Sequence, residues 1–365
     1  MLKPIHPVPC SPALRACREL QVHLLAWLCD PSVSGVNVTK ASLQQLPALT
    51  PIEADWLWTL LEKSDGKRAL LERAQLLAGM PPSEKLALYG WGQSVVALTD
   101  QFQPNPPSWP QDKPAIPSPA WQAIKQLMEA FYTKGLASGL PYSSNGAPVG
   151  SGGVNRASFV NAFRSEHRPH PDAIDLCVLC GGELGDTPEV DHWISKGQYP
   201  LLSVCQDNLV PICHDCNSPA NKGEKPVHTA GCFDDWFHPY LRSGHGKVIV
   251  DYRLNSRSVI CAAVNQSDAV KVRNLDELLN LSARWTRSFK AEYRIQQDDL
   301  RRIAKKKMQL QQDTVSRVEI QNHLQEEQSK LSPERPWYEV HCALFAALLH
   351  QSRLDAWQTE LELAT

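Results

Sequence analysis

Two cysteine pairs carry the first piece of chemistry that this sequence can support. Cys177 and Cys180 form one Cys-x-x-Cys pair, and Cys213 and Cys216 form a second pair after an interval of 32 residues. Each pair makes a tight turn whose sulfur atoms converge on one ion, and four thiolates are the ligand set that tetrahedral zinc prefers. A four-cysteine site leaves no open position for water, so we expect this zinc to be structural.

The segment between the pairs holds residue types that a structural zinc site does not need. Asp191 and His192 put a carboxylate beside an imidazole, Asn208 follows, and Asn217 comes directly after the last cysteine. Carboxylate and amide oxygens suit a hard cation such as Mg²⁺. Imidazole, with an unperturbed pKa of about 6.5, exchanges protons near neutral pH. These residues can therefore hold a hard metal ion and move a proton.

The order of these residues resembles the HNH endonucleases of the ββα-metal superfamily, in particular a zinc-containing bacterial subgroup. The pieces that carry the resemblance are "DHWISKGQYP" at 191–200, "NLVPICHDCN" at 208–217 and "FHPY" at 237–240. Several independent pieces occur in the right order over about residues 173–240. Two positions depart from the usual pattern, because Asn217 replaces a histidine and Ser195 replaces a proline.

The resemblance implies a role for each residue of the motif. His192 is expected to be the general base, Asp191 a ligand to one Mg²⁺ or Mn²⁺, Asn208 the residue that braces the loop, and Asn217 the second protein ligand. Asn221, one helical turn beyond Asn217, is the alternative ligand. The expected reaction is hydrolysis of DNA phosphodiester bonds. Since adjacent side chains on a regular strand point to opposite faces, the strand that carries Asp191 and His192 should end or distort there.

Charge is distributed unevenly along the chain. Residues 173–240 hold ten acids against three lysines, whereas residues 241–310 hold fifteen Lys or Arg against seven acids. Binding of duplex DNA should therefore draw on the basic segment, although a solvated surface is the alternative for any single charge run. The predicted nucleic-acid contacts in this basic segment are Arg284, Arg287, Lys290 and Arg294. Lys196 and Lys222, which lie in the motif-bearing segment, are also predicted contacts.

The segments around the motif divide into predicted domains. Apolar residues at three and four residue spacing predict a helical domain at 1–102, and seven prolines in seventeen residues predict a semi-stiff linker at 103–119. Residues 120–172 are predicted as a helix and a Gly-rich loop that lead into the nuclease domain at 173–240.

The C-terminal region, 241–365, is predicted to begin with a β-hairpin and to continue as basic helices. Two β-like runs at 247–254 and 258–264 form the hairpin. A long helical stretch is expected from 275 to about 310, and one more helix at 337–361.

These elements together predict an α+β fold, a mainly helical chain with a small zinc-stapled ββα-metal domain and a short β-hairpin after it. No apolar run approaches the roughly 18 to 20 residues that a membrane span needs. Eleven cysteines are too sparse for a disulfide scaffold. We therefore expect a cytoplasmic protein with DNA as its partner and no membrane partner.

Two other interpretations stay open. In the first, the four thiolates organise a non-catalytic surface for nucleic acid or protein, and the Asp191-His192 pair is incidental. The second keeps the nuclease chemistry and makes the chain an effector subunit of an anti-phage defence system, with a protein partner bound through residues 1–102. The sequence does not decide the oligomeric state.

Overall fold

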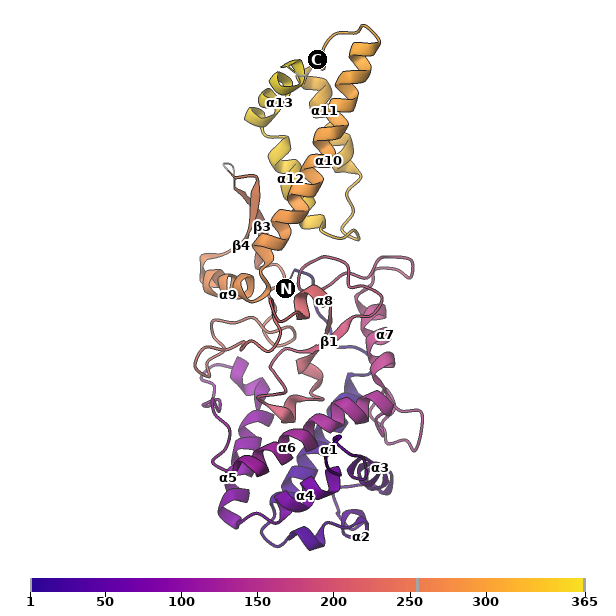
Figure 1. The fold of residues 1–365 in the computed structure, drawn as a ribbon, viewed down its shortest axis with the longest axis vertical. Helices are drawn as coiled ribbons and strands as arrows, with labels where there is room; N and C mark the ends of the chain where they lie inside the picture. The colour runs from indigo at the N-terminus through magenta and orange to yellow at the C-terminus, as the bar shows by residue number, and fades with distance from the viewer. Residues whose placement is uncertain (1, 254–255, 364–365) are drawn as a thin grey trace. The chain divides into compact units, whose positions relative to one another are not determined.

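The computed structural model describes residues 2–253 and 256–363 (Figure 1). The fold is mixed α+β and mainly helical: 53% of the chain is helical, and the strands form two small antiparallel sheets. Two compact units are present, unit 1 with Met1–Pro4, Arg168–Asp186 and Gly244–Thr365, and unit 2 with Ile5–His167 and Thr187–Ser243. Among the described residues, no helix is both long enough and apolar enough to cross a membrane.

Unit 2 begins with the helices that the apolar spacing predicts. Buried leucines follow one face of the first of them, and a capping box of Thr50 and Glu53 fixes the start of the third. A π-helical segment, Phe131–Leu136, continues the sixth helix. The helices are α1 (Ser11–Cys29), α2 (Lys40–Gln44), α3 (Pro51–Leu61), α4 (Leu70–Ala78), α5 (Pro82–Val96), α6 (Ser118–Ala130) and α7 (Arg156–His167).

The proline-rich segment at 103–119 lies inside unit 2 and is held by aromatic packing. Trp109 is buried, and its ring centroid lies 5.1 Å from that of Tyr199 and 5.3 Å from that of Phe233. The Tyr199 hydroxyl donates to the carbonyl oxygen of Pro110 at 2.9 Å. The bounds of the two units thus differ from those of the predicted domains, because this segment packs against residues around 200 and 233.

Unit 2 also holds the first sheet, which lies in the segment with the candidate site. Strands β1 (Glu189–His192) and β2 (Leu209–Ile212) pair antiparallel, with Asp191 opposite Val210 and His192 opposite Leu209. The short helix α8 (His214–Asn217) follows β2 directly. The order is therefore strand, strand, helix.

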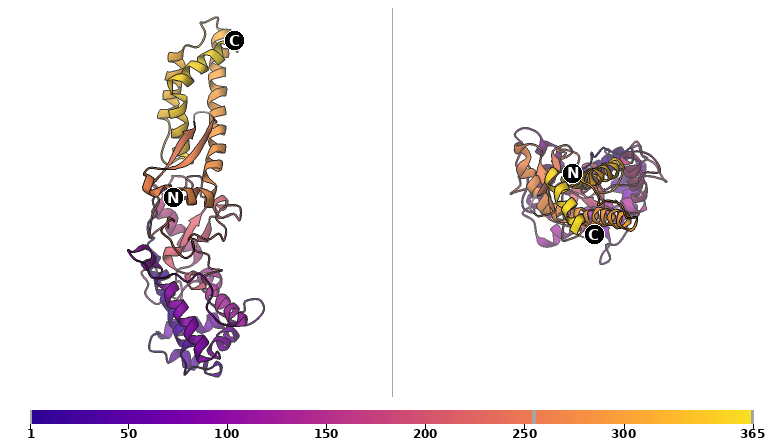
Figure 2. Two further views of the ribbon diagram at one scale, coloured as in Figure 1. Left: turned by 90° about the vertical axis from the view of Figure 1, so that its left-hand side faces the viewer. Right: turned by 90° about the horizontal axis from the view of Figure 1, so that it is seen from above.

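Unit 1 holds the second sheet and a group of helices, shown in orange and yellow in Figure 2. Strands β3 (Val248–Arg253) and β4 (Ser258–Ala263) confirm the predicted hairpin, although Leu254 and Asn255 of its connection lie outside the described residues. The helices are α9 (Ala269–Leu279), α10 (Leu281–Gln309), α11 (Arg317–Ser329), α12 (Tyr338–Leu348) and α13 (Gln351–Leu363).

The helices of unit 1 differ from the prediction in three respects. The stretch expected from 275 to about 310 breaks into α9 and α10, because Asn280 adopts the left-handed conformation with φ of 52°. The predicted tail helix divides into α12 and α13, since the chain turns at residues 349–350 and Leu354 starts a new series of bonds to the carbonyl of His350. Helix α11 was not expected, as its sequence is mostly polar.

Candidate active site

Asp191 and His192 lie at the end of strand β1 and line the same cavity. The strand ends at His192, as the sequence predicts, and the next residue, Trp193, donates its backbone N–H to the carbonyl of Asn208 at 2.9 Å. The cavity has a volume of about 420 Å³. Its other polar lining residues are Ser195, Lys196, Asn217 and Glu224.

The imidazole of His192 is held by one backbone carbonyl. Its Nε2 atom lies 2.9 Å from the oxygen of Ser203, and because a carbonyl only accepts, this nitrogen carries the proton. Burial lowers the pKa of His192 to about 3, and the nearby charges of Lys196 and Lys222 act in the same direction. The ring is therefore neutral, and Nδ1 bears a lone pair that no described residue contacts as a hydrogen-bond donor.

Asn208 fixes the loop that supplies this carbonyl. Its side chain is fully buried, its Oδ1 accepts from Ile194 N–H at 2.7 Å, and its Nδ2 donates to the carbonyls of Ile194 at 2.9 Å and Leu202 at 3.2 Å. The amide thus ties residue 194 to residue 202, next to Ser203. The structure gives Asn208 contacts of the kind expected of a bracing residue.

The carboxylate of Asp191 lies beside a buried lysine. Lys222 has no solvent exposure, and its Nζ lies 3.2 Å from Oδ2 and 3.4 Å from Oδ1 of Asp191. The same ammonium donates to the carbonyls of His192 and Gly223, both at 3.0 Å. Burial raises the pKa of Asp191, and the charge of Lys222 opposes that rise. Lys222 was predicted to contact phosphate, whereas in the structure its ammonium is enclosed and directed at Asp191.

One oxygen of Asp191 lacks a hydrogen bond. The approach of Lys222 to Oδ2 does not have hydrogen-bond geometry, and no other donor among the described residues reaches this buried atom. Buried carboxylate oxygens normally have hydrogen-bond partners, and a bound metal ion can take the place of a missing donor. Oδ2 thus fits the role of a metal ligand.

Asn217 reaches the cavity from α8 with its amide oriented by a neighbour. Its Nδ2 donates to Oε2 of Glu189, whose Oε1 lies 2.7 Å from Nδ1 of His214. Hydrogen bonds from Asn217 and His214 lower the pKa of Glu189. Since the NH₂ group faces Glu189, Oδ1 is the amide atom left for another partner. Asn221 instead donates to the carbonyl of Asp215 at 2.6 Å and does not line the cavity.

Residues from the helical part of unit 2 complete the surroundings of His192. The π-helical segment places the Tyr132 ring edge-on to the His192 ring, with the two ring centroids 4.5 Å apart. The Tyr132 hydroxyl donates to the carbonyl of Val190 at 3.2 Å. The Arg156 guanidinium and the Lys196 ammonium lie 5.4 and 5.7 Å from the Tyr132 ring centroid. Of the predicted phosphate contacts, Lys196 therefore lies at the cavity.

The sequence did not single out Glu189, Tyr132 or Arg156. Glu189 had a usable signal, because residues two apart on a strand share a face and Glu189 stands two before Asp191. Tyr132 and Arg156 lie 60 and 36 residues before His192. No local pattern connects them to the motif.

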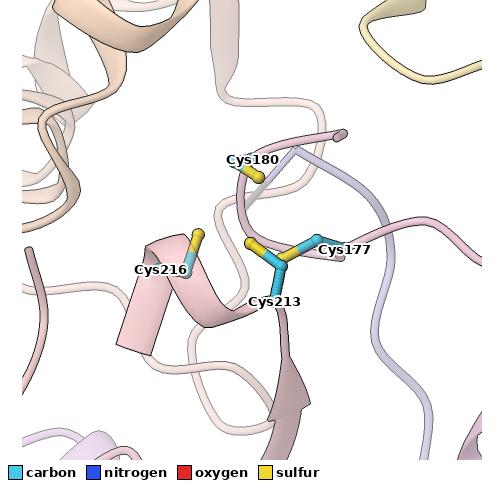
Figure 3. Close-up of side chains that lie close together, drawn as sticks. All are labelled: Cys177, Cys180, Cys213 and Cys216. Atoms are coloured by element: carbon cyan, nitrogen blue, oxygen red, sulfur yellow. The ribbon is translucent and has the colours of Figure 1, made fainter. Parts of the chain in front are cut away.

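Four buried cysteines form a second candidate site (Figure 3). The sulfur atoms of Cys177, Cys180, Cys213 and Cys216 all lie within 4.8 Å of one another. Backbone bonds close a tight turn around the first pair, with Gly181 N–H donating to Cys177 O at 2.9 Å. Four converging thiolates are a suitable ligand set for one zinc ion.

The predicted basic residues of α10 do not all face solvent. Arg287, Lys290 and Arg294 are exposed. Arg284 is only 5% exposed, and its Nη1 donates to the carbonyl of Leu279 at 3.2 Å. Arg284 does not belong with the exposed residues, because it lies on the buried face next to Trp285.

Comparisons with known proteins find one local similarity. No protein-family model matches the chain, and no solved structure matches it. Protein ea31 of Escherichia phage lambda is 39% identical over 71 residues, which cover 18% of this chain and 21% of that protein. The chain thus spans about a fifth of the length of the curated relative that it matches.

Proposed function

We propose that this chain is an endonuclease of the HNH type that hydrolyses DNA phosphodiester bonds with the help of one Mg²⁺ or Mn²⁺ ion. The observation that supports this most directly is the shared cavity of Asp191, His192 and Asn217. It combines a neutral imidazole with two oxygen donors of the type that Mg²⁺ prefers. The order of β1, β2 and α8 agrees with the ββα arrangement that the sequence resemblance implies.

Each residue has a distinct part in the proposed reaction. Nδ1 of His192 takes the proton of the attacking water, while the bond from Nε2 to Ser203 O keeps the ring in the required tautomer. Oδ2 of Asp191 and Oδ1 of Asn217 would hold the ion, and Glu189 orients the asparagine. The bound ion would neutralise charge on the phosphate and assist the departing oxygen. Lys196 at the cavity would contact a phosphate.

In the same proposal, the four cysteines hold a structural zinc ion. Cys213 directly precedes α8 and Cys216 lies within it, next to Asn217. Zinc would thereby fix the helix that presents the amide ligand. A role as an effector subunit of anti-phage defence is a further proposal, and co-purification of a partner bound through residues 1–102 would test it.

One observation favours the alternative of a non-catalytic zinc module. Lys222 already neutralises Asp191, so the pair is able to serve as an internal ion pair that needs no metal. In that case the surface organised by zinc would bind nucleic acid or protein without cleaving it.

Incubation of supercoiled plasmid with the full chain and Mg²⁺ or Mn²⁺ separates the two functions. The nuclease proposal expects nicked or linear products, which the His192→Ala variant does not make while it keeps one equivalent of zinc. Cleavage by that variant would exclude His192 as the base. Absence of cleavage by the folded, zinc-loaded wild type with either ion would favour the binding module.

A further inference from the structure

We infer that the exposed face of α10, together with the turn at Ser256 and Arg257, binds the phosphate backbone of duplex DNA. The inference rests on the proposed nuclease function only in its choice of DNA as the polyanion, since the active site itself is not used. The site, which we call the α10 groove, is a cavity of about 490 Å³ in unit 1. Its charged lining residues are Arg257, Lys290, Arg294, Arg301 and Asp298.

The basic residues of α10 lie along one line of the helix surface. Arg287, Lys290, Arg294, Arg301 and Lys305 are all exposed. At about 100° per residue, these five positions fall within about 60° of one another around the helix axis. At about 1.5 Å per residue, they extend over about 27 Å. A straight row of this length matches about eight base pairs of duplex, which rise about 3.4 Å each.

The charges of this row have few partners within the protein. Among residues 2–253 and 256–363, no acidic group lies within ion-pair distance of Arg287, Lys290 or Lys305. Asp298 lies in the groove and pairs loosely with Arg294 at 3.9 Å and Arg301 at 3.8 Å. Four cations against one carboxylate leave the groove strongly positive. Unpaired cations in a row attract a polyanion and release its counterions.

Arg257 adds a cation from outside the helix. Its guanidinium lies 5.6 Å from the ring centroid of Tyr293, and the guanidinium of Arg353 lies 5.5 Å from the same centroid. This contact holds the arginine over α10 beside Lys290 and Arg294, and the groove thereby gains a second wall. Two walls with cations allow contact with adjacent phosphates on one strand.

The composition of the groove favours duplex DNA over single strands. Proteins that bind single strands stack bases on exposed aromatic rings. The aromatic residue here, Tyr293, is only 7% exposed and already stacks with two arginines. The groove offers cations for the backbone and no exposed ring for bases. We therefore expect binding that is independent of base sequence and sensitive to salt.

Fluorescence anisotropy with a short labelled duplex, without Mg²⁺ or Mn²⁺, tests the groove separately from cleavage. The Lys290→Glu/Arg294→Glu variant should bind at least tenfold more weakly at about 100 mM salt. Its slope of log K against log salt should be shallower by about two, because each lost phosphate contact removes about 0.9. Asp298→Asn should bind about twofold more tightly, because it removes the one opposing charge.

A matched control carries the same change of charge elsewhere in unit 1. Arg273 and Arg335 are exposed and lie outside α10, so Arg273→Glu/Arg335→Glu should keep the wild-type slope. Equal losses in the two double variants would overturn the inference, as would preference for vesicles containing phosphatidylserine over the duplex. If the groove binds DNA but the protein never cuts it, the inference about the groove holds and the nuclease proposal fails. If the groove variants bind and cut DNA as the wild type does, the nuclease proposal holds and the inference about the groove fails.

Discussion

The ammonium group of Lys222 lies 3.2 Å from Oδ2 of Asp191, and both side chains are withdrawn from solvent. Removal of one member of a buried ion pair leaves the other charge uncompensated, which is strongly destabilising. Replacement of both members is often close to neutral. The pair thus gives a test of the site that does not depend on activity.

Lys222→Met should lower the free energy of unfolding by about 3 to 5 kcal/mol in urea titrations. Asp191→Asn in the same chain should restore most of the loss. If Asp191 is a metal ligand, Mn²⁺ should stabilise Lys222→Met more than the wild type, because the cation replaces the missing charge. The same stability for the single variant as for the wild type would show that the pair contributes nothing.

Mn²⁺ titrations should distinguish the two asparagines. Asn217→Ala is expected to weaken Mn²⁺ binding at least tenfold, whereas Asn221→Ala should leave it unchanged, because only Asn217 lines the cavity. Glu189→Ala should also weaken binding by about tenfold, since the amide of Asn217 loses the acceptor that orients it. Calorimetry measures all three constants. If Asn221→Ala weakened Mn²⁺ binding and Asn217→Ala left it unchanged, the ligand would be Asn221.

Zinc content should depend on the clustered cysteines alone. Cys216→Ser is expected to reduce bound zinc from one equivalent to much less, with a lower melting temperature, because one of four thiolates is lost. Cys205 provides the matched control, since it is equally buried and lies outside the cluster. Cys205→Ser should keep its zinc. Metal analysis of the purified variants gives the answer, and full zinc in Cys216→Ser would rule out a four-thiolate site.

Acid should weaken unit 2 through Asp65. Burial raises the pKa of Asp65, but hydrogen bonds from the backbone N–H groups of Arg68 and Lys67 and from Arg73 outweigh it and hold the pKa at about 2. The stabilisation is complete above the ordinary value of 3.8 and is lost as the pH falls towards 2. Asp65→Asn should therefore be less stable than the wild type at pH 7, and the difference should shrink between pH 4 and 2.

The exposed residue Asp100 serves as the control for this experiment. Asp100→Asn should follow the wild type at every pH in the same urea titrations. A constant difference between wild type and Asp65→Asn down to pH 2 would contradict the assignment.

Local patterns in the sequence predicted the parts of the structure that short-range physics determines. Apolar spacing predicted the helical character of residues 1–102, two β-like runs located β3 and β4, and the paired Cys-x-x-Cys turns predicted the cysteine cluster. The strand end at His192 followed from the need for two adjacent side chains to face one site.

What the sequence did not reveal depends on packing between distant segments. Lys222 was predicted to be an exposed phosphate contact. The residues that enclose it, Trp193 and the end of β1, lie about 30 positions earlier in the sequence, so no local pattern reveals the burial. Arg284 shares its helical spacing with exposed arginines, and only the tertiary fold decides which face is covered. The Tyr132 contact with His192 joins a helix to a strand across 60 residues.

The hydroxyl of Ser203 donates to the carbonyl of Met128 at 2.7 Å and accepts from Gln21 at 3.0 Å, while the carbonyl of Ser203 accepts from His192. The imidazole is thus anchored, through one serine, to α1 and α6. A fragment cut to the motif-bearing residues 173–240 would lose that anchor together with Tyr132. The helices that precede the motif are therefore part of the scaffold that orients the histidine, and the smallest autonomous version of this site must include them.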